Sequence, residues 1–311
     1  MVSIAMLATA PAGAHDPARA LTSTSDGAPW TFEPWAVALL VASAMLYALG
    51  LVRLWRIAGP GHGVSIAQAV RFALGWLTLA AALVSPLDSV SERAFSAHMV
   101  QHELFMLVAA PLLASSRPLG AFAWGLGPLL AARAGGALRN ATWRRFWRML
   151  CAPVCAWVLH AAALWIWHVP ALFDAALRSE AWHIAQHLSF FATALLFWWS
   201  VLKPRTNTGR GIAILSLFAT MMQTGALGVL LALSNAIWYA PYLAPDAASP
   251  FGLTPLEEQQ LGGLVMWVPA SLVYLAVALA IGYRWLAPTK SRLSPRLAAD
   301  SGFDPDYPRA R

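Results

Sequence analysis

The chain has 311 residues, of which 59% are hydrophobic and only 11% are charged, and its formal net charge is +7. Soluble domains carry roughly 25% charged residues, so this composition excludes an ordinary soluble protein. The basic excess does not indicate nucleic-acid binding. The basic residues lie in short connections beside apolar segments, where retention on the cytoplasmic side and contact with anionic lipids explain them.

Apolar stretches of about 20 residues recur along the chain, each long enough to cross a hydrocarbon core of roughly 30 Å. Backbone groups in lipid must be hydrogen-bonded internally, and no segment alternates with period two, so we expect α-helices. The sequence therefore predicts an all-α polytopic membrane protein, a bundle of seven transmembrane helices within residues 35–286. The predicted spans are 35–57, 67–86, 94–116, 149–168, 181–202, 211–234 and 261–286.

Two terminal segments flank the predicted bundle. The first, 1–34, contains Ala12-Gly13-Ala14, which resembles a signal-peptide cleavage site, but it lacks the usual basic stretch before the apolar region. A cleaved signal peptide, an uncleaved external tail and a misassigned start codon all stay open. The last segment, 287–311, is rich in Pro, Arg and Asp and is predicted to be a disordered cytoplasmic tail.

The basic residues decide the predicted orientation, because they resist translocation. All but three of the 21 Lys and Arg residues fall on one side of the predicted bundle, the exceptions being Arg19, Arg93 and Arg178. This asymmetry predicts an external N-terminus and a cytoplasmic C-terminus. The external connections carry acidic residues that could attract a cation or a partner domain, or simply solvate the surface: Asp88, Glu92, Asp174, Glu180, Asp246, Glu257 and Glu258.

The longest internal connection runs over about residues 117–148 and contains alternating aromatic and arginine residues from Trp143 to Arg148. This pattern is typical of an interfacial helix. The helix is predicted to anchor the chain to the membrane surface, and a docking site for a partner is the alternative.

Six of the eight histidines gather near the predicted outer face. His98 and His102 open the third span and His183 and His187 open the fifth. An i,i+4 spacing puts two imidazoles on one face of a helix, about 6 Å apart along its axis. His160 and His168 lie in the outer half of the fourth span. Counted from the outer boundary, the depth is roughly 10 Å for His102, 12 Å for His160 and 7 Å for His187, so three helices each present a histidine at a similar level.

This arrangement predicts a metal or cofactor site, because ionisable residues inside membrane spans are costly and neutral imidazole is a common metal ligand. The nearby methionines Met106 and Met266 favour copper, since thioether and imidazole together suit Cu(I). Each methionine on its own is equally compatible with packing. His15 and His62 lie in the tail and in an internal loop and receive no role.

Zinc hydrolysis is excluded by the sequence that follows His102. His102-Glu103 begins like the HExxH motif, but Met106 stands where the second histidine is required. Glu103 is predicted either to orient an imidazole or to have a structural role. Cys151 and Cys155 fall near the cytoplasmic end of the fourth span, where we expect buried thiols; a transient copper site is the alternative.

Several motifs resemble one known family. They are SPLD at 85–88, HMVQH at 98–102, WHVPALFDAAL at 167–177, HIAQH at 183–187, LLFWW at 195–199 and QQLGGLVMWVP at 259–269. In this order they resemble the multi-span CtaG family of cytochrome c oxidase assembly factors, which is distinct from the single-span copper chaperone of the same name. The resemblance covers about residues 85–270 and leaves the first span and both tails without support.

The resemblance implies a multi-pass protein of the bacterial inner (plasma) membrane, needed to assemble an active caa-type haem–copper oxidase through the copper centre of its catalytic subunit. His160 lies outside the family motifs. Glu257 and Glu258 stand where the family more often has Asp nearby. The positions that match family motifs are His98, His102, His168, His183, His187, Asp88, Asp174 and Met266.

The sequence thus predicts a non-enzymatic assembly factor with an outer-leaflet copper site. The expected ligands are His98, His102, His183 and His187, with His168, His160, Met266 and Met106 as further candidates. Expected partners are the oxidase catalytic subunit or another copper chaperone, and membrane lipids. One alternative is a b-type cytochrome or quinone-linked oxidoreductase, in which His102 with His187 or His160 would ligate haem. A copper transporter is another, and it would need ligands across the whole bilayer.

Overall fold

The computed structural model describes residues 30–202, 206–244 and 249–287. The predicted cleavage site and nearly all of the predicted C-terminal tail lie outside these residues. The described part is built from helices and contains no strand, which confirms the all-α prediction.

Six helical segments are long and apolar enough to cross a membrane. They are α2 (Pro34–Ala58), α3 (Ile66–Val84), the composite segment Phe95–Ser116, α11 (Glu180–Val201), α12 (Asn207–Ala232) and α13 (Pro255–Leu286). A seventh span results if α8 (Ala141–Leu150) and α9 (Pro153–Trp167), bent by 63° at their junction, cross the membrane together. The predicted spans therefore fall on observed helices, whereas the orientation of the termini stays a prediction.

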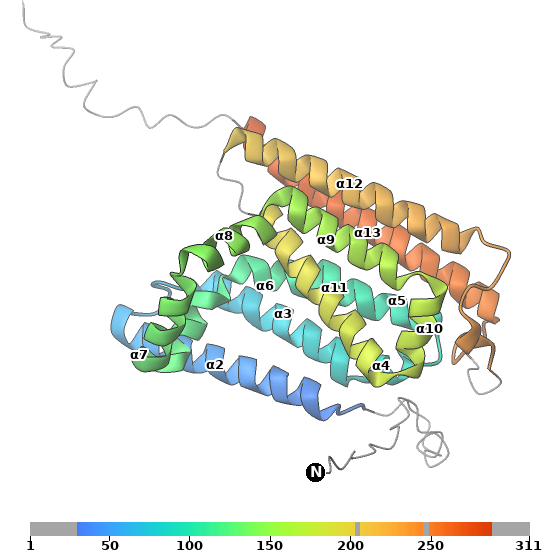
Figure 1. Cartoon of the computed structure of the whole chain (residues 1–311), viewed down its shortest axis with the longest axis horizontal. Helices are drawn as coiled ribbons and strands as arrows, with labels where there is room; N and C mark the ends of the chain where they lie inside the picture. Colours follow the sequence, from blue (N-terminus) through green and yellow to red (C-terminus); the bar gives the residue numbers. More distant parts are fainter. Residues whose placement is uncertain (1–29, 203–205, 245–248, 288–311) are drawn as a thin grey trace, which may run out of the picture.

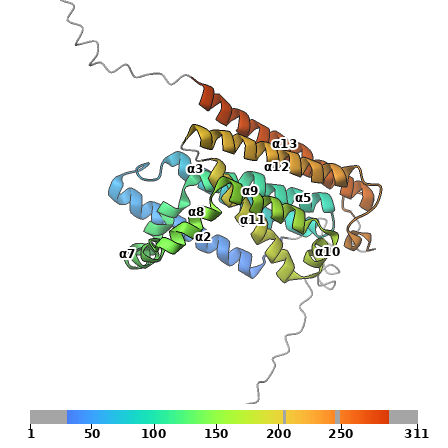
Figure 2. The ribbon, with the colours of Figure 1, turned by 45° about the horizontal axis from the view of Figure 1, so that its top comes forward.

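The long helices run side by side along the long axis of the molecule (Figure 1). α12 and α13 pair along one edge and α2 lies at the opposite edge, with α3, α5, α9 and α11 between them (Figures 1 and 2). The short helix α10 (Pro170–Arg178) lies at one end of the bundle, and α7 (Pro118–Leu138) and α8 lie at the other. The bundle therefore has two chemically different ends, since α8 is the arginine-rich helix.

Local sequence signals explain where several helices begin. α3 starts with a capping box between Ser65 and Gln68, and α13 starts with one between Thr254 and Glu257. The segment 143–148 lies in a helix, α8, whose N-cap Asn140 accepts backbone N–H groups of its first turn. Its predicted place at the membrane interface stays a prediction. None of the residues of α8 is buried, as expected for a helix on the surface of the bundle.

The fourth predicted span, 149–168, is shorter than expected. Its helix, α9, begins at Pro153, because proline lacks a backbone N–H and suits the first turn of a helix rather than its interior. Cys151 caps the end of α8 and Cys155 lies in the first turn of α9. The two cysteines are therefore on different helices and do not share one helical face, and both are partly rather than fully buried.

The third span changes its helical geometry in the middle. It runs from α5 (Phe95–Glu103) through a π-helix, η1 (Leu104–Ala109), into α6 (Ala110–Ser116). Within η1 the carbonyl of Met106 accepts a hydrogen bond from the indole N–H of Trp198 on α11 at 2.7 Å. π-Helical turns are rare and frequent at functional sites, and this one directly follows the two histidines of α5.

Candidate metal centre

α5 and α11 bring the two HxxxH pairs together. His98 and His102 lie on α5, and His183 and His187 on α11. The two helices are in matching register: the rings of His98 and His183 have centroids 5.9 Å apart, and those of His102 and His187 5.3 Å. Within each helix the paired rings are 4.3 Å and 4.1 Å apart. Equal spacing on two adjacent helices thus produces a two-by-two group, here called the four-histidine cluster.

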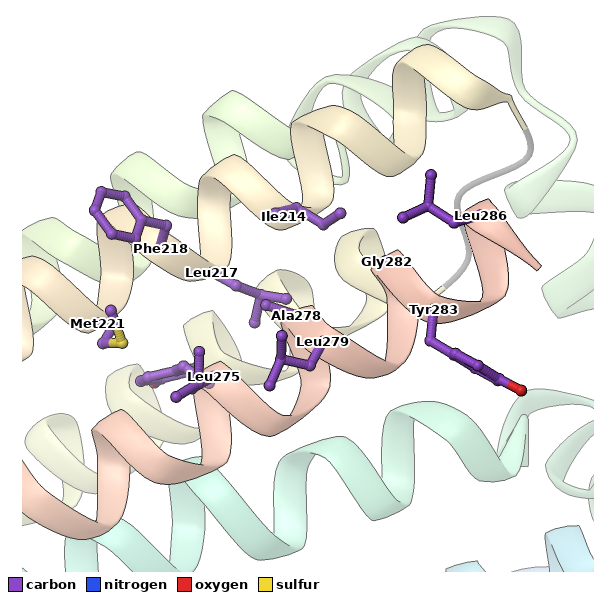
Figure 3. Close-up of a pocket in the computed structure, with 11 residues that line it drawn as sticks. Ile214, Leu217, Phe218, Met221, Leu275, Ala278, Leu279, Gly282, Tyr283 and Leu286 are labelled. Atoms are coloured by element: carbon purple, nitrogen blue, oxygen red, sulfur yellow. The ribbon is translucent and has the colours of Figure 1, made fainter.

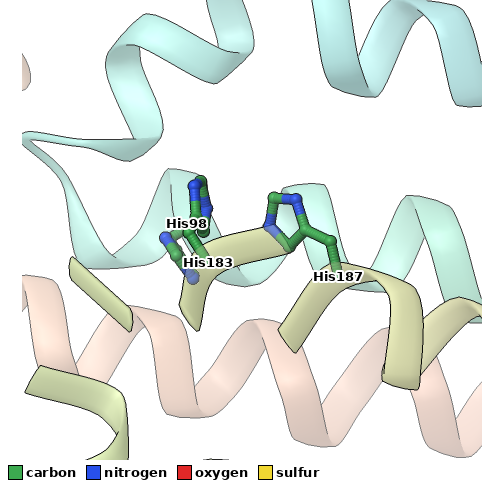
Figure 4. Close-up of side chains that lie close together, drawn as sticks. All are labelled: His98, His183 and His187. Atoms are coloured by element: carbon green, nitrogen blue, oxygen red, sulfur yellow. The ribbon is translucent and has the colours of Figure 1, made fainter. Parts of the chain in front are cut away.

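Three members of this cluster approach the geometry of a metal site. One ring nitrogen each from His98, His183 and His187 lies within 4.8 Å of the others (Figure 4). Imidazole nitrogens bind first-row metals at about 2.0–2.1 Å, so two ligands of one ion are at most roughly 4.2 Å apart. Side-chain shifts of about an ångström or less complete such a site.

The fourth ring, His102, is buried between His98 and His187, and neither of its nitrogens has a hydrogen-bond partner among the described residues. Nε2 of His98 and Nε2 of His187 are likewise unsatisfied. A buried polar atom without a partner costs free energy, and native structures rarely leave one without a reason. The donor set therefore fits a bound cation: buried imidazoles converge, and the nitrogens named above have no hydrogen-bond partner in the described part of the chain.

His168 lies at the edge of the cluster. Its Nδ1 donates to the carbonyl of Leu164 at 2.7 Å, which leaves the buried Nε2 free. Its ring contacts Phe173 and Phe190, and these two rings also contact His98 and His102. His168 thus shares aromatic neighbours with the cluster, and its role as a ligand stays a prediction.

His160 does not join the cluster in this structure. It is buried, its Nδ1 lies 3.3 Å from the hydroxyl of Thr193, and its ring stacks on Phe197. Thr193 is six residues beyond His187 on α11, roughly 9 Å further along the helix axis. Depth counted along α9 placed His160 level with the other histidines, but the side chain meets a deeper part of α11.

The predicted methionine ligands pack in the apolar core. Met106 lies in the central core cluster with Phe105 and Phe190, and Met266 lies in a second cluster with Phe95 and Tyr239. Both side chains are buried. Their packing role is therefore visible, and their role as ligands stays a prediction.

Glu103 has no hydrogen bond to an imidazole in the described part of the chain. Both nitrogens of the adjacent His102 lack hydrogen bonds, and Oε2 of Glu103 has no partner either. The carboxyl group instead lies near Tyr274 of α13. Of the two roles predicted for Glu103, the structural one is therefore favoured, since His102 and Glu103, as consecutive helical residues, project about 100° apart.

An outer cap that the sequence did not reveal holds α5 in place. Glu258 at the start of α13 accepts the backbone N–H of Ser96 at 3.0 Å. Gln259 is hydrogen-bonded to the backbone of Trp238, which fixes the connection between α12 and α13. From this connection the hydroxyl of Tyr239 donates to the carbonyl of His168, and burial raises the pKa of this phenol. The QQLGGLVMWVP motif was the only available signal for this cap.

Asp88 belongs to the same region and is also buried, although both Asp88 and Glu258 were predicted to lie in exposed acidic connections. Asp88 sits on the short helix α4 (Pro86–Ser91), and its Oδ1 accepts a hydrogen bond from Gln101 of α5 at 2.7 Å. Burial raises the pKa of Asp88 to about 6, an effect that the hydrogen bond from Gln101 opposes. Asp174 is partly exposed beside Arg178, Glu257 is exposed, and Asp246 lies outside the described residues.

A groove on another part of the molecule is unrelated to the histidines. It has a volume of about 570 Å³ and lies between α12 and α13, with walls formed by apolar side chains such as Leu217, Phe218 and Leu279 (Figure 3). No histidine lines it.

Comparison with known proteins identifies the family. No curated protein and no solved structure matches the chain. The sequence profile of the family described as cytochrome c oxidase caa3 assembly factor (Caa3_CtaG) matches residues 45–287, which is most of the chain and includes every histidine of the cluster. The chain therefore belongs to the family of caa3-type cytochrome c oxidase assembly factors.

Proposed function

We propose that the protein supports oxidase assembly by holding copper at the four-histidine cluster and making it available for the copper centre of the oxidase catalytic subunit. The observation that carries this proposal is the convergence of buried, unsatisfied imidazole nitrogens from α5 and α11. The expected partner is the catalytic subunit itself or another copper chaperone that exchanges metal with it. Bound copper would supply the ion for transfer, and the chain would supply its ligands.

The charge of the donor set favours Cu(I) over divalent ions. The group of converging ligands consists of neutral imidazoles and includes no carboxylate. An ion held by neutral ligands keeps its whole charge in a poorly polar environment, and this cost increases with the charge of the ion. Soft ligands nearby, Met106 and Met266, suit the same ion if the core rearranges.

The predicted orientation places the cluster on the external side of the bacterial plasma membrane. Arg144, Arg145 and Arg148 lie on α8, at the end of the bundle opposite to α10 (Figure 1). Basic residues are retained on the cytoplasmic side, so the end with α10 and the histidines would face outward. Copper would then be held on the external side of the membrane.

A b-type haem is a poorer fit to the same residues. Axial ligation requires a flat macrocycle between two imidazoles, whereas the rings of His102 and His187 meet nearly perpendicularly with centroids 5.3 Å apart. His160 is separated from both along the helix axes.

A copper transporter would need ligands through the whole bilayer, whereas the clustered histidines come from one end of the bundle.

Metal analysis of the purified full chain tests the proposal. We expect the wild type to bind Cu(I), and the double variant His98→Ala/His102→Ala to lose the ion and to fail to restore oxidase activity in cells that lack the protein. His62→Ala is the control, because His62 is exposed in the turn between α2 and α3. Unchanged copper content and oxidase activity in the double variant would overturn the proposed site.

A further inference from the structure

The two histidine motifs each contain a glutamine, and the two glutamines have different surroundings. Gln101 in HMVQH and Gln186 in HIAQH both directly precede the second histidine, and both are fully buried. The amide nitrogen of Gln101 donates to Asp88 and to the carbonyl of Ala82, which ties α5 to its neighbours. Gln101 is therefore held by the fold.

Gln186 has no comparable structural role. Neither its amide oxygen nor its amide nitrogen has a hydrogen bond of standard geometry among the described residues, although the side chain is 0% exposed. Each unsatisfied buried polar group costs roughly 1–3 kcal/mol. An apolar residue of similar size would avoid this cost, so the amide is expected to serve something other than packing.

Gln186 lies next to a member of the four-histidine cluster, His98. The amide approaches the ring of His98 across the interface between α5 and α11 and falls short of a well-formed hydrogen bond, and the backbone carbonyl of Ser91 is a second partner of the same ring. Coordination would draw the cluster together, because nitrogens now up to 4.8 Å apart must come within roughly 4.2 Å. A rearrangement of that size is enough to complete the contact between Gln186 and His98.

We propose that Gln186 is a positioning residue for the metal centre: its amide oxygen, together with the backbone carbonyl of Ser91, accepts the N–H of one ring nitrogen of His98 and leaves the other ring nitrogen free to bind the ion. This inference rests on the proposed copper-binding function. A neutral imidazole carries one proton, and the hydrogen bond made by one nitrogen decides which nitrogen is the ligand. Such outer partners typically account for 10–100-fold in metal affinity.

Copper binding by the purified full chain, measured by competition with a chromophoric Cu(I) chelator, tests this role. Gln186→Leu removes the acceptor and keeps the approximate size, and we expect Cu(I) affinity to fall 10–100-fold. The X-ray absorption spectrum of the bound ion should show one imidazole fewer. Gln186→Glu keeps an acceptor oxygen and should retain both the affinity and the spectrum.

Two further measurements separate positioning from structural support. Gln223→Leu is the matched control, because Gln223 is a partly buried glutamine on α12 whose amide nitrogen is also unsatisfied, and its affinity should equal that of the wild type. Without copper, Gln186→Leu should melt no lower than the wild type, since replacing an unsatisfied amide by an apolar group is neutral or stabilising.

Three outcomes would contradict the inference in different ways. Wild-type affinity in Gln186→Leu overturns the positioning role alone. A lower melting temperature of copper-free Gln186→Leu, together with weaker binding, assigns the residue to the fold instead. Failure of the wild type to bind Cu(I) overturns the proposed function itself and, with it, this inference.

Discussion

Glu258 offers a direct test of the outer cap that positions α5. Its buried carboxylate accepts two hydrogen bonds, one from the backbone N–H of Ser96 at 3.0 Å and one from the hydroxyl of Ser249 at 2.5 Å. Ser96 lies in the first turn of α5, where backbone N–H groups have no partner within the helix. The Glu258→Ala variant removes both bonds and leaves this N–H buried and unsatisfied.

The expected loss follows from these two bonds. A hydrogen bond to a charged group contributes roughly 1.5–3 kcal/mol, so two such bonds at the lower end of this range contribute about 3 kcal/mol. We therefore expect the free energy of unfolding to fall by about 3 kcal/mol, or roughly 6–12 °C in melting temperature on the scale of soluble domains of similar size. Copper affinity should fall as well, because Ser96 is two residues from His98.

Thermal unfolding of the detergent-solubilised chain, followed by circular dichroism, measures this loss. The neighbouring Glu257→Ala is the matched control, since Glu257 is exposed and its side chain bonds only to Thr254 at the start of the same helix. Its melting temperature should fall by less. Equal melting temperatures for the two variants would show that the buried carboxylate does not hold α5, and the reasoning about the cap would be refuted.

Two other features of the bundle give predictions of their own. Because burial raises the pKa of Asp88 from 3.8 to about 6, the folded state binds its proton more tightly than the unfolded state; stability should be greatest below about pH 4 and fall by up to roughly 3 kcal/mol as pH rises through 6. Melting curves from pH 4 to 7 should show this fall in the wild type but not in Asp88→Asn, and parallel profiles would contradict the assignment. A Cβ atom on Gly50 would lie 1.8 Å from the carbonyl oxygen of Ala121, so Gly50→Ala should force α2 and α7 apart and cost about 1–3 kcal/mol or more. Gly120→Ala, at an open position on α7, should melt like the wild type, and equal melting of the two variants would rule out a tight crossing.

The pairing of histidines within each helix was predictable from the sequence. The i,i+4 spacing of His98 with His102 and of His183 with His187 pairs the rings only if both segments are helical. The long apolar stretches that contain them predict such helices. That the two pairs would meet also followed in outline, since both open a predicted span from the same side. The distances between the pairs depend on how α5 and α11 pack, and the sequence does not specify this packing directly.

The surroundings of the cluster could not be predicted in the same way. Glu258 and Asp88 occur in acidic stretches typical of a solvated surface, but both are buried. Glu258 is hydrogen-bonded to Ser96 and Ser249, and Asp88 to Gln101. His160 has the expected depth on α9 but meets Thr193, because depth along a helix does not specify the direction of a side chain. Gln186 looks like an ordinary polar residue until its burial and its lack of partners are known.

The sequence by itself determined that this chain is a helical membrane protein with paired imidazoles near one end, because apolar length and helical periodicity are local properties of the chain. The tertiary structure decided which imidazoles converge, which acids are buried and which glutamine is left unsatisfied. These outcomes depend on the rotation and register of helices relative to one another. Contacts among many side chains set that rotation and register together, and no single stretch of sequence encodes them.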